Sequence, residues 1–189
     1  MNKSSARKLF LSKRHSLSEH ELEAINCALL AHFKPLDLSS VQFLHLFLPI
    51  RAKKEVNTYP IAEWIRQNYP EIKLVLSRSN FEDHSLTHLI WNEQTVLTEN
   101  AWGITEPQNG EAVSAQKLDL ILVPLLVFDE TGQRIGYGKG FYDRFLAACR
   151  PDAQKIGLSH FEPIVQIEDT NSFDIRLDAC ISPKKIWKF

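Results

Sequence analysis

Residues 118–149 read LDLILVPLLVFDETGQRIGYGKGFYDRFLAAC, and this stretch carries the strongest fold signal in the chain. The apolar run at 118–128 is typical of a strand buried on both faces. Residues 129–132 predict a turn, and residues 141–149 predict a helix. A buried strand, a glycine-rich turn and a helix in this order indicate one unit of a layered α/β fold.

The rest of the chain continues this alternation of helices and strands. Ser18 and Glu21 have the spacing of a capping box, and Thr58 is expected to be the N-cap of a later helix. We therefore predict an α/β fold with helices and strands in these places: helices at 3–14, 18–33 and 58–69, strands at 41–48, 73–77, 87–91, 155–161 and 178–182.

Three glycines alternate within the turn, at positions 136, 138 and 140. Glycine permits positive φ and lets a ligand approach the main chain closely. Free amides at a helix start, together with the helix dipole, bind anions. Lys139 and Arg134 would add positive charge, so we expect a phosphate-binding turn rather than a merely flexible connection.

The turn matches neither of the two common nucleotide-binding motifs. Gln133 stands where a Walker A loop needs its first glycine, and Phe141 stands at the third glycine of a Rossmann fingerprint. Asp143 follows in the first turn of the helix. It is expected either to complement the helix dipole or to bind Mg²⁺ beside the phosphates.

Two other polar segments have open interpretations. Lys3, Arg7 and Arg14 share one face of the first predicted helix. Spacing alone favours a solvated face over a phosphate clamp that closes on the turn. Glu55, in the loop after the strand at 41–48, is expected either to accept hydrogen bonds from an amino-bearing heterocycle or to be an ordinary surface acid.

Composition narrows the function classes. The 189 residues carry 22 basic and 23 acidic side chains, a net charge of −1, which gives no basic field for a nucleic acid. The three cysteines have no metal-binding or disulfide pattern, and no apolar run approaches the length of a membrane span. We expect a cytoplasmic protein with no nucleic-acid partner and no membrane association.

The signature segment closely resembles that of the 5-formyltetrahydrofolate cyclo-ligase family, also called methenyltetrahydrofolate synthetases. The resemblance rests on Leu122-Val123-Pro124, Phe128-Asp129 and the run from Gly132 to Arg144. Weaker matches along the whole chain appear in this order: Lys3 with Arg7, Leu48-Pro49, Glu55-Val56-Asn57-Thr58, Gly103-Ile104-Thr105-Glu106-Pro107 and Asp174.

The resemblance implies one domain over residues 1–189, with a three-layer α/β/α fold and a mostly parallel central sheet of the NagB/RpiA/CoA-transferase-like kind. It also implies an ATP- and Mg²⁺-dependent reaction that converts 5-formyltetrahydrofolate to 5,10-methenyltetrahydrofolate and releases ADP and phosphate. In that mechanism the formyl oxygen is phosphorylated, and N10 then closes the ring as phosphate leaves. We expect the enzyme to be a monomer.

The resemblance also assigns roles to residues. ATP would contact Lys3, Ser4, Ser5, Ala6, Arg7, Arg134, Ile135, Gly136, Tyr137, Gly138, Lys139, Gly140, Phe141 and Tyr142. Folate would contact Leu48, Glu55 and Tyr142. The catalytic side chains would be Lys139, Tyr142 and Arg144. Magnesium would bind Asp143 and Asp174.

Two positions depart from the family pattern. Asn57 stands where bacterial members usually have an acid, and Asp174 lacks the usual flanking residues, so Asp169 and Asp178 are alternative metal ligands. Two other functions remain: a phosphotransferase or sugar-phosphate enzyme whose turn binds substrate phosphate, or a nucleotide-binding module without catalysis.

Overall fold

A computed structural model describes all residues, 1–189. Its central sheet has eight strands in the order β12-β11-β10-β7-β1-β2-β3-β6. From β11 to β2 neighbouring strands are parallel, whereas β12, β3 and β6 pair antiparallel at the two sides. The strand bounds are β1 Phe43–His45, β2 Lys73–Asn80, β3 Ser85–Ile90, β6 Ala112–Val113, β7 Leu120–Pro124, β10 Gln154–Leu158, β11 Ala179–Ile181 and β12 Ile186–Lys188.

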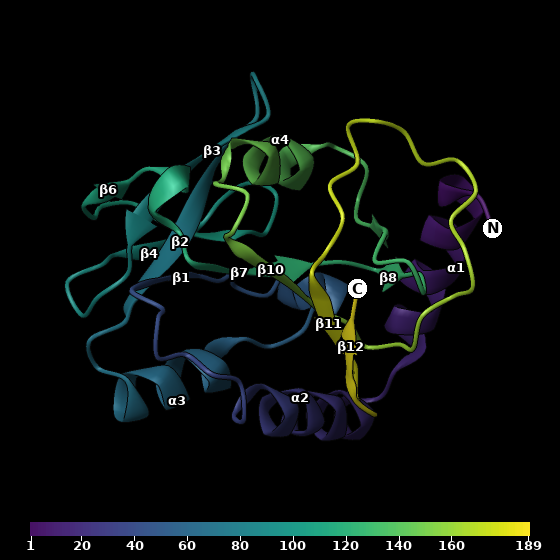
Figure 1. The fold of residues 1–189 in the computed structure, drawn as a ribbon, viewed down its shortest axis with the longest axis horizontal. Helices are drawn as coiled ribbons and strands as arrows, with labels where there is room; N and C mark the ends of the chain where they lie inside the picture. The colour runs from purple at the N-terminus through teal and green to yellow at the C-terminus, as the bar shows by residue number, and fades with distance from the viewer.

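Helices cover both faces of this sheet, which gives the predicted three layers (Figure 1). Helices α2 (Glu19–Phe33) and α3 (Tyr59–Asn68) lie on one face, and α4 (Phe141–Ala148) lies on the other. Helix α1 (Lys3–Ser16) lies beside the sheet, next to the segment 160–178 (Figure 1). Two short 3-10 helices complete the helical content: η1 Arg51–Lys53 and η2 Ala115–Lys117.

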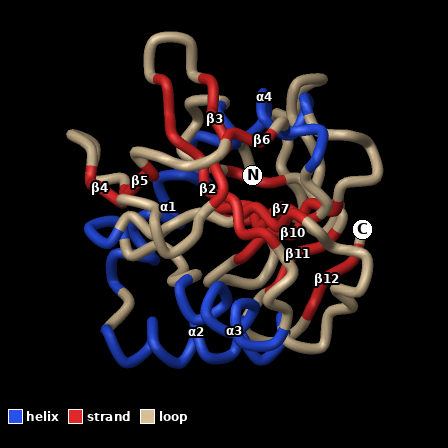
Figure 2. The backbone as a smooth tube through the Cα atoms, turned by 90° about the vertical axis from the view of Figure 1, so that its left-hand side faces the viewer, coloured by secondary structure: helices blue, strands red, loops and turns tan.

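Two small two-stranded sheets extend from the main one, and Figure 2 shows β4 and β5 projecting beside β2. Strands β4 (Leu97–Glu99) and β5 (Thr105–Pro107) form one of them. Strands β8 (Val127–Phe128) and β9 (Arg134–Ile135) form the other, and the turn that was predicted at 129–132 joins them. The glycine-rich segment therefore follows a hairpin and does not follow the buried strand directly.

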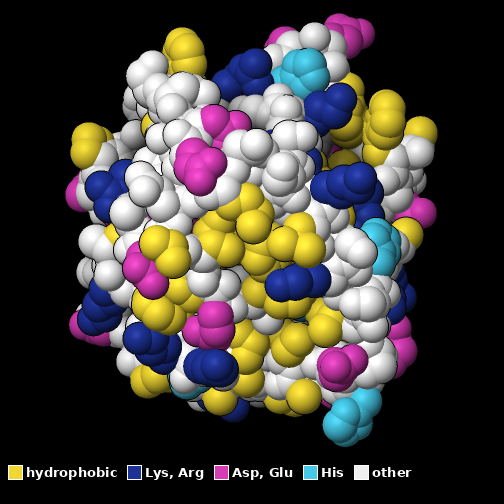
Figure 3. Space-filling view, turned by 90° about the vertical axis from the view of Figure 1, so that its right-hand side faces the viewer, with side chains coloured by type: hydrophobic (Ala, Val, Ile, Leu, Met, Phe, Trp, Pro, Cys, Tyr) yellow, Lys and Arg dark blue, Asp and Glu magenta, His cyan; other side chains and the backbone are white.

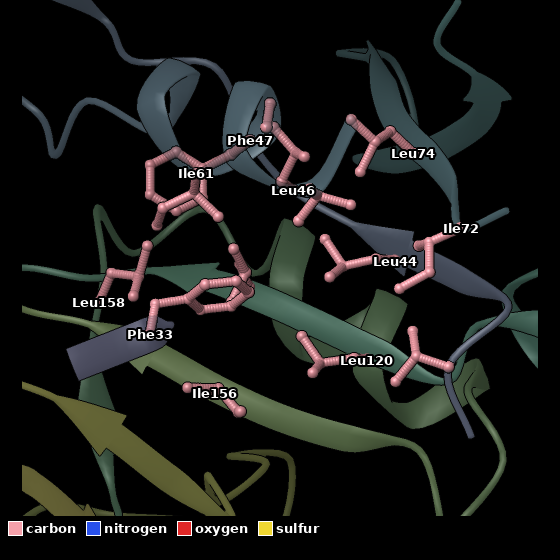
Figure 4. Packing of buried hydrophobic residues seen from close by; sticks show 14 of the residues in the cluster. Phe33, Leu44, Leu46, Phe47, Ile61, Ile72, Leu74, Leu120, Ile156 and Leu158 are labelled. Atoms are coloured by element: carbon pink, nitrogen blue, oxygen red, sulfur yellow. The ribbon is translucent and has the colours of Figure 1, made fainter. Parts of the chain in front are cut away.

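The largest core cluster fills the space between the sheet and the helices α2 and α3. Phe33 and Ile61 from these helices pack among Leu44, Leu120 and Ile156 of the sheet (Figure 4). Alternate residues on the opposite face pack under α4 in a second cluster. Burial on both faces explains why the central strands are almost continuously apolar in sequence.

Several sequence predictions are confirmed, and others need correction. The capping box of Ser18 and Glu21 is present in α2. Thr58 is the N-cap residue of α3, as predicted, but its hydroxyl donates to the Phe47 carbonyl and makes no capping hydrogen bond to the helix. The run at 118–128 also proves not to be one strand. It leaves the main sheet at Pro124 and forms β8 three residues later, because the same apolar pattern suits two consecutive buried strands.

Candidate active site

A cavity of about 1130 Å³ opens at the carboxyl ends of β1, β2 and β7. This is where ligands bind in open α/β sheets. Most of the predicted site residues line it together, although they come from distant parts of the sequence: Lys3, Arg7, Leu48, Glu55, Arg134, Ile135, the run from Gly136 to Arg144, and Asp174. Ser4 and Ser5 point to solvent instead, and Ala6 is buried against other apolar residues.

The glycine turn presents its main chain to this cavity. No backbone amide from residue 136 to residue 143 donates to an acceptor within the protein. Gly140 is the N-cap of α4 with φ 76°, and no side chain caps this helix. Unpaired amides at a helix N-terminus form an anion-binding site, so the geometry fits the predicted phosphate turn.

Protein packing restricts two of the three glycines of the turn to glycine. Gly138 has φ 84°, and a Cβ there would lie 2.9 Å from the Arg7 guanidinium. A Cβ on Gly140 would lie 2.7 Å from Nη1 of Arg144. A Cβ on Gly136 would meet nothing within 4 Å. Protein packing therefore does not require glycine at 136, and the empty space beside it is open to a ligand.

The face of α1 that carries Lys3, Arg7 and Arg14 is not solvated. Arg7 donates from Nε to the Gly136 carbonyl at 3.0 Å, and Arg14 is only 2% exposed. The preference for a solvated face was therefore wrong, because spacing along a helix does not show which surface packs against that face. This side of α1 faces the glycine turn.

Two carboxylates of the cavity are paired with basic side chains. Asp143 Oδ1 accepts from Arg134 at 2.8 Å, and Asp174 Oδ2 accepts from Lys3 at 2.5 Å. Burial lowers the pKa of Arg134, and the charge of Asp143 opposes that shift. Asp143 therefore does more than complement the dipole of α4.

The remaining oxygens of these carboxylates are relevant to a metal. Oδ2 of Asp143 and Oδ1 of Asp174 accept no hydrogen bond from the protein. No cluster of three or more His, Cys, Asp or Glu side chains is placed to hold a metal ion. Two carboxylates with free oxygens suit Mg²⁺ only when phosphate or water oxygens complete its shell.

Neither alternative metal ligand lines the cavity. Asp178 pairs with Lys155 at 3.3 Å, next to β10. Asp169 accepts from the backbone amide of Lys3 at 2.6 Å. Asn57 does not line the cavity either, and its side chain accepts from the Tyr59 amide at the start of α3.

Glu55 is buried, not a surface acid, and both of its oxygens are engaged. Oε2 accepts from the Ile50 amide at 2.9 Å, and Oε1 accepts from the Tyr137 hydroxyl at 2.6 Å. Arg14 in turn donates to that hydroxyl. Leu48, which also lines the cavity, follows the end of β1.

The three predicted catalytic side chains lie in different surroundings. Lys139 is exposed, and its ammonium has no hydrogen-bond partner in the protein. Arg144 folds back and donates to the Lys139 carbonyl at 3.2 Å. Tyr142 packs against His45 and Phe145, and burial raises the pKa of its phenol.

Sequence reasoning missed a polar trio beneath Tyr142. The Ser77 hydroxyl lies 2.7 Å from Nε2 of His45 and 2.9 Å from Nδ1 of His88. Burial lowers the pKa of both imidazoles, to about 4 for His88 and well below its ordinary value for His45. The three residues lie on different strands, so no local sequence motif predicts that they meet.

Aromatic residues at the mouth of the cavity were also missed. Phe81, between β2 and β3, stacks on Trp102 with ring centroids 5.3 Å apart and touches Phe141 edge-on. Trp102 is 64% exposed and Phe173 is 81% exposed. An isolated aromatic residue in a turn gives no sequence signal for such a cluster.

The surface on the side of α1 carries charges of both signs. On the face that carries α1, acidic and basic side chains are interspersed with apolar atoms between them (Figure 3). No patch of a single charge sign covers this face.

None of the helices combines the length and the apolar character that a membrane crossing requires.

Comparison with known proteins agrees with this geometry. The model of the 5-formyltetrahydrofolate cyclo-ligase family matches residues 1–183. The 5-formyltetrahydrofolate cyclo-ligase of Escherichia coli (strain K12) is 31% identical over 138 residues, which cover 71% of this chain and 75% of the relative. The cyclo-ligase of Mycoplasma genitalium is 27% identical over 186 residues, 96% of this chain and 98% of the relative.

Solved structures lead to the same group of proteins. The NMR structure of Aquifex aeolicus 5,10-methenyltetrahydrofolate synthetase superposes with a TM-score of 0.83 at 30% identity, covering 100% of this chain and 93% of that one. The synthetase of Mycoplasma pneumoniae, at 23% identity, shares the fold with a TM-score of 0.72. The chain therefore belongs to the 5-formyltetrahydrofolate cyclo-ligase family.

Proposed function

We propose that this chain converts 5-formyltetrahydrofolate to 5,10-methenyltetrahydrofolate with consumption of ATP. One observation carries the proposal beyond the family match. A turn with unpaired amides and a buried carboxylate, Glu55, line the same cavity. The first suits a polyphosphate, and the second suits a heterocycle that donates hydrogen bonds.

The proposed chemistry is a phosphoryl transfer followed by ring closure. The formyl oxygen attacks the γ-phosphorus, and ADP leaves. N10 then attacks the activated carbon and loses its proton, and the former formyl oxygen departs with phosphate. Phosphoryl transfer depends mainly on positioning and charge neutralisation. We assign these tasks to the amides of residues 136–143, with Lys139 and Arg144 as positive charges beside the transferring group.

Magnesium fits the carboxylates of the cavity. Asp143 and Asp174 would hold it through the oxygens that accept no hydrogen bond from the protein. The bound ion would neutralise phosphate charge. The ion pairs of Asp143 with Arg134 and of Asp174 with Lys3 would hold the two carboxylates in place for the metal.

We assign folate recognition to the side of the cavity that holds Glu55, Leu48 and Tyr142. The Glu55 carboxylate would accept hydrogen bonds from the pterin, while the two apolar surfaces pack against the ring. The cavity brings together residues from position 3 to position 175, which supports a single domain, and we propose that the enzyme is a monomer. Three unpaired cysteines support a reducing compartment, the cytoplasm.

The test is direct. The purified chain is incubated with 5-formyltetrahydrofolate, ATP and Mg²⁺, and the absorbance of methenyltetrahydrofolate is followed while ADP is measured in parallel. We expect one ADP for each folate converted and no product without ATP. ATP hydrolysis that is independent of folate would favour a different phosphotransferase, and nucleotide binding without any turnover would favour a non-catalytic module.

A further inference from the structure

A continuous chain of three polar side chains connects helix α1, the glycine turn and the loop after β1. Arg14 donates from Nη2 to the Tyr137 hydroxyl. That hydroxyl donates to Oε1 of Glu55 at 2.6 Å. A phenol has one proton to donate, so this direction leaves its oxygen free to accept from the guanidinium.

The two outer members of this hydrogen-bonded series, Arg14 and Glu55, are charged and buried. Arg14 is 2% exposed and Glu55 is 9% exposed, and no ion pair joins them directly. Nε of Arg14 has no hydrogen-bond partner at all. Buried charges require compensating partners. The Tyr137 phenol is thus the link through which these opposite charges meet.

The surroundings keep this phenol protonated and in place. Burial, together with the charge of Glu55, raises the pKa of Tyr137. The ammonium of Lys53 lies 4.4 Å from the centre of the Tyr137 ring. Burial and the Arg14 guanidinium lower the pKa of His160 to about 3, so this imidazole is neutral and adds no second positive charge beside Arg14.

The backbone of the same tyrosine belongs to the phosphate turn. Tyr137 lies between Gly136, whose carbonyl accepts from Arg7, and Gly138, where a Cβ would lie 2.9 Å from that guanidinium. Its main chain is therefore part of the segment with unpaired amides, while its side chain donates a hydrogen bond to Glu55. One residue thus takes part in both halves of the cavity.

We propose that Tyr137 is a positioning residue that couples occupancy of the phosphate turn to the readiness of Glu55 for folate. Phosphates that order the turn fix the phenol, and the phenol fixes the carboxylate. This inference rests on the proposed function for the identity of the two ligands. Thermodynamic linkage makes the coupling reciprocal: folate tightens nucleotide binding by the same factor as nucleotide tightens folate binding.

The test is the substitution Tyr137→Phe, which removes the hydroxyl and keeps the ring. Titration calorimetry measures the affinity for 5-formyltetrahydrofolate with and without a non-hydrolysable ATP analogue. We expect the analogue to tighten folate binding about tenfold in the wild type, within the usual range of such couplings. In the variant this factor should fall close to one, while the affinity for the analogue alone changes by less than about twofold.

Steady-state kinetics adds a readout that general loosening of the fold does not reproduce. In Tyr137→Phe we expect the KM for folate at saturating ATP and the KM for ATP at saturating folate to rise by the same factor, about tenfold, because loss of the coupling weakens the binding of each ligand in the presence of the other. Tyr69→Phe is the matched control. It removes the hydroxyl from a ring that packs against Trp64, outside the cavity, and should leave both constants unchanged.

Loss of the Tyr137 hydroxyl leaves a buried guanidinium without a partner, so the single variant risks poor folding. The double variant Arg14→Met with Tyr137→Phe removes that charge as well and should show the same loss of coupling, with a thermal midpoint nearer the wild type. Coupling that persists in either folded variant overturns the inference.

The proposed function fails in a different way. A wild-type chain that forms no methenyl product, yet binds both ligands with Tyr137-dependent coupling, overturns the function and supports the coupling. A wild type that turns over normally, with coupling retained after loss of the hydroxyl, overturns the coupling alone.

Discussion

Lys139 is the cation of the glycine turn whose ammonium meets no protein acceptor. We expect Lys139→Met to lower kcat by about 10²-fold, since removal of one preorganised charge or donor beside a transferring group typically costs that much. The thermal midpoint should stay unchanged because the side chain is exposed. The exposed Lys117, which does not line the cavity, provides the control Lys117→Met, which should keep full activity. Equal kcat values in both variants would remove Lys139 from the mechanism.

Asp143 serves two partners in the proposed site, Arg134 and the metal. Asp143→Asn keeps the shape and removes the charge, so we expect the Mg²⁺ concentration for half-maximal rate to rise at least about tenfold, with a lower kcat at saturation. Circular dichroism should confirm that the variant is folded. Asp152→Asn removes an exposed acid that pairs with Arg150 and should leave the Mg²⁺ dependence unchanged. A Mg²⁺ curve that is identical in wild type and Asp143→Asn would contradict the metal role.

Single residues were predictable from sequence to the extent that their role is local. The turn, Lys139 and Asp143 sit within one short segment, so their spacing carries the signal. Glu55 left two interpretations open, because its burial depends on Tyr137, 82 positions later in the chain. The contacts of Ser77 with His45 and His88 could not be predicted for the same reason, because contacts between side chains on different strands produce no pattern in the sequence.

Among the elements, helix α2 allows a direct test of how much its N-terminal capping box stabilises the fold. Ser18 caps its first turn reciprocally with Glu21, and the surface there is exposed. Ser18→Ala should lower the free energy of unfolding by about 1 kcal/mol, measured by urea denaturation, with the kinetic constants unchanged. Ser40→Ala, at an exposed serine whose hydroxyl makes no hydrogen bond, should cost much less. An equal loss in both variants would mean that the cap contributes nothing.

Elements whose ends carry local sequence signals were predicted well. Elements that depend on pairing or packing with distant segments were not. The start of α2 follows from its capping box, its end from the proline at position 35, and the start of α4 from the glycine at position 140. The apolar run at 118–128 does not reveal that it belongs to two sheets, because β8 exists only through its pairing with β9. The packing of α1 against the turn likewise depends on the whole fold.

For the whole molecule, buried histidines predict a dependence of stability on pH. Burial lowers the pKa of His88 to about 4 and that of His160 to about 3, and holds His45 well below its ordinary value. In the unfolded chain these imidazoles protonate near pH 6.5, so the unfolded state binds more protons below that pH. The free energy of unfolding should therefore fall as pH drops from about 6.5 toward 4.

Urea denaturation at about pH 7 and about pH 5 checks this expectation, because most carboxylates are still ionised in that range. Each buried histidine should contribute on the order of 1 kcal/mol per pH unit within the window. His88→Gln should remove one contribution and reduce the slope, whereas His20→Gln, at an exposed position of α2, should not. A slope that is the same in wild type and His88→Gln would exclude His88 as a source.

The cavity is closed by two segments that lie at opposite ends of the sequence. The ammonium of Lys3 meets Asp174 across 171 positions, and Arg7 reaches the Gly136 carbonyl across 129. Contacts of such separation form late in folding, after loop-closure entropy has been overcome. A chain cut before residue 174 would keep the central strands β1, β2 and β7 and the glycine turn, yet it would lack one wall around the phosphates. Nucleotide affinity should therefore appear only in the last stage of folding, and a partly folded chain would not bind ATP tightly.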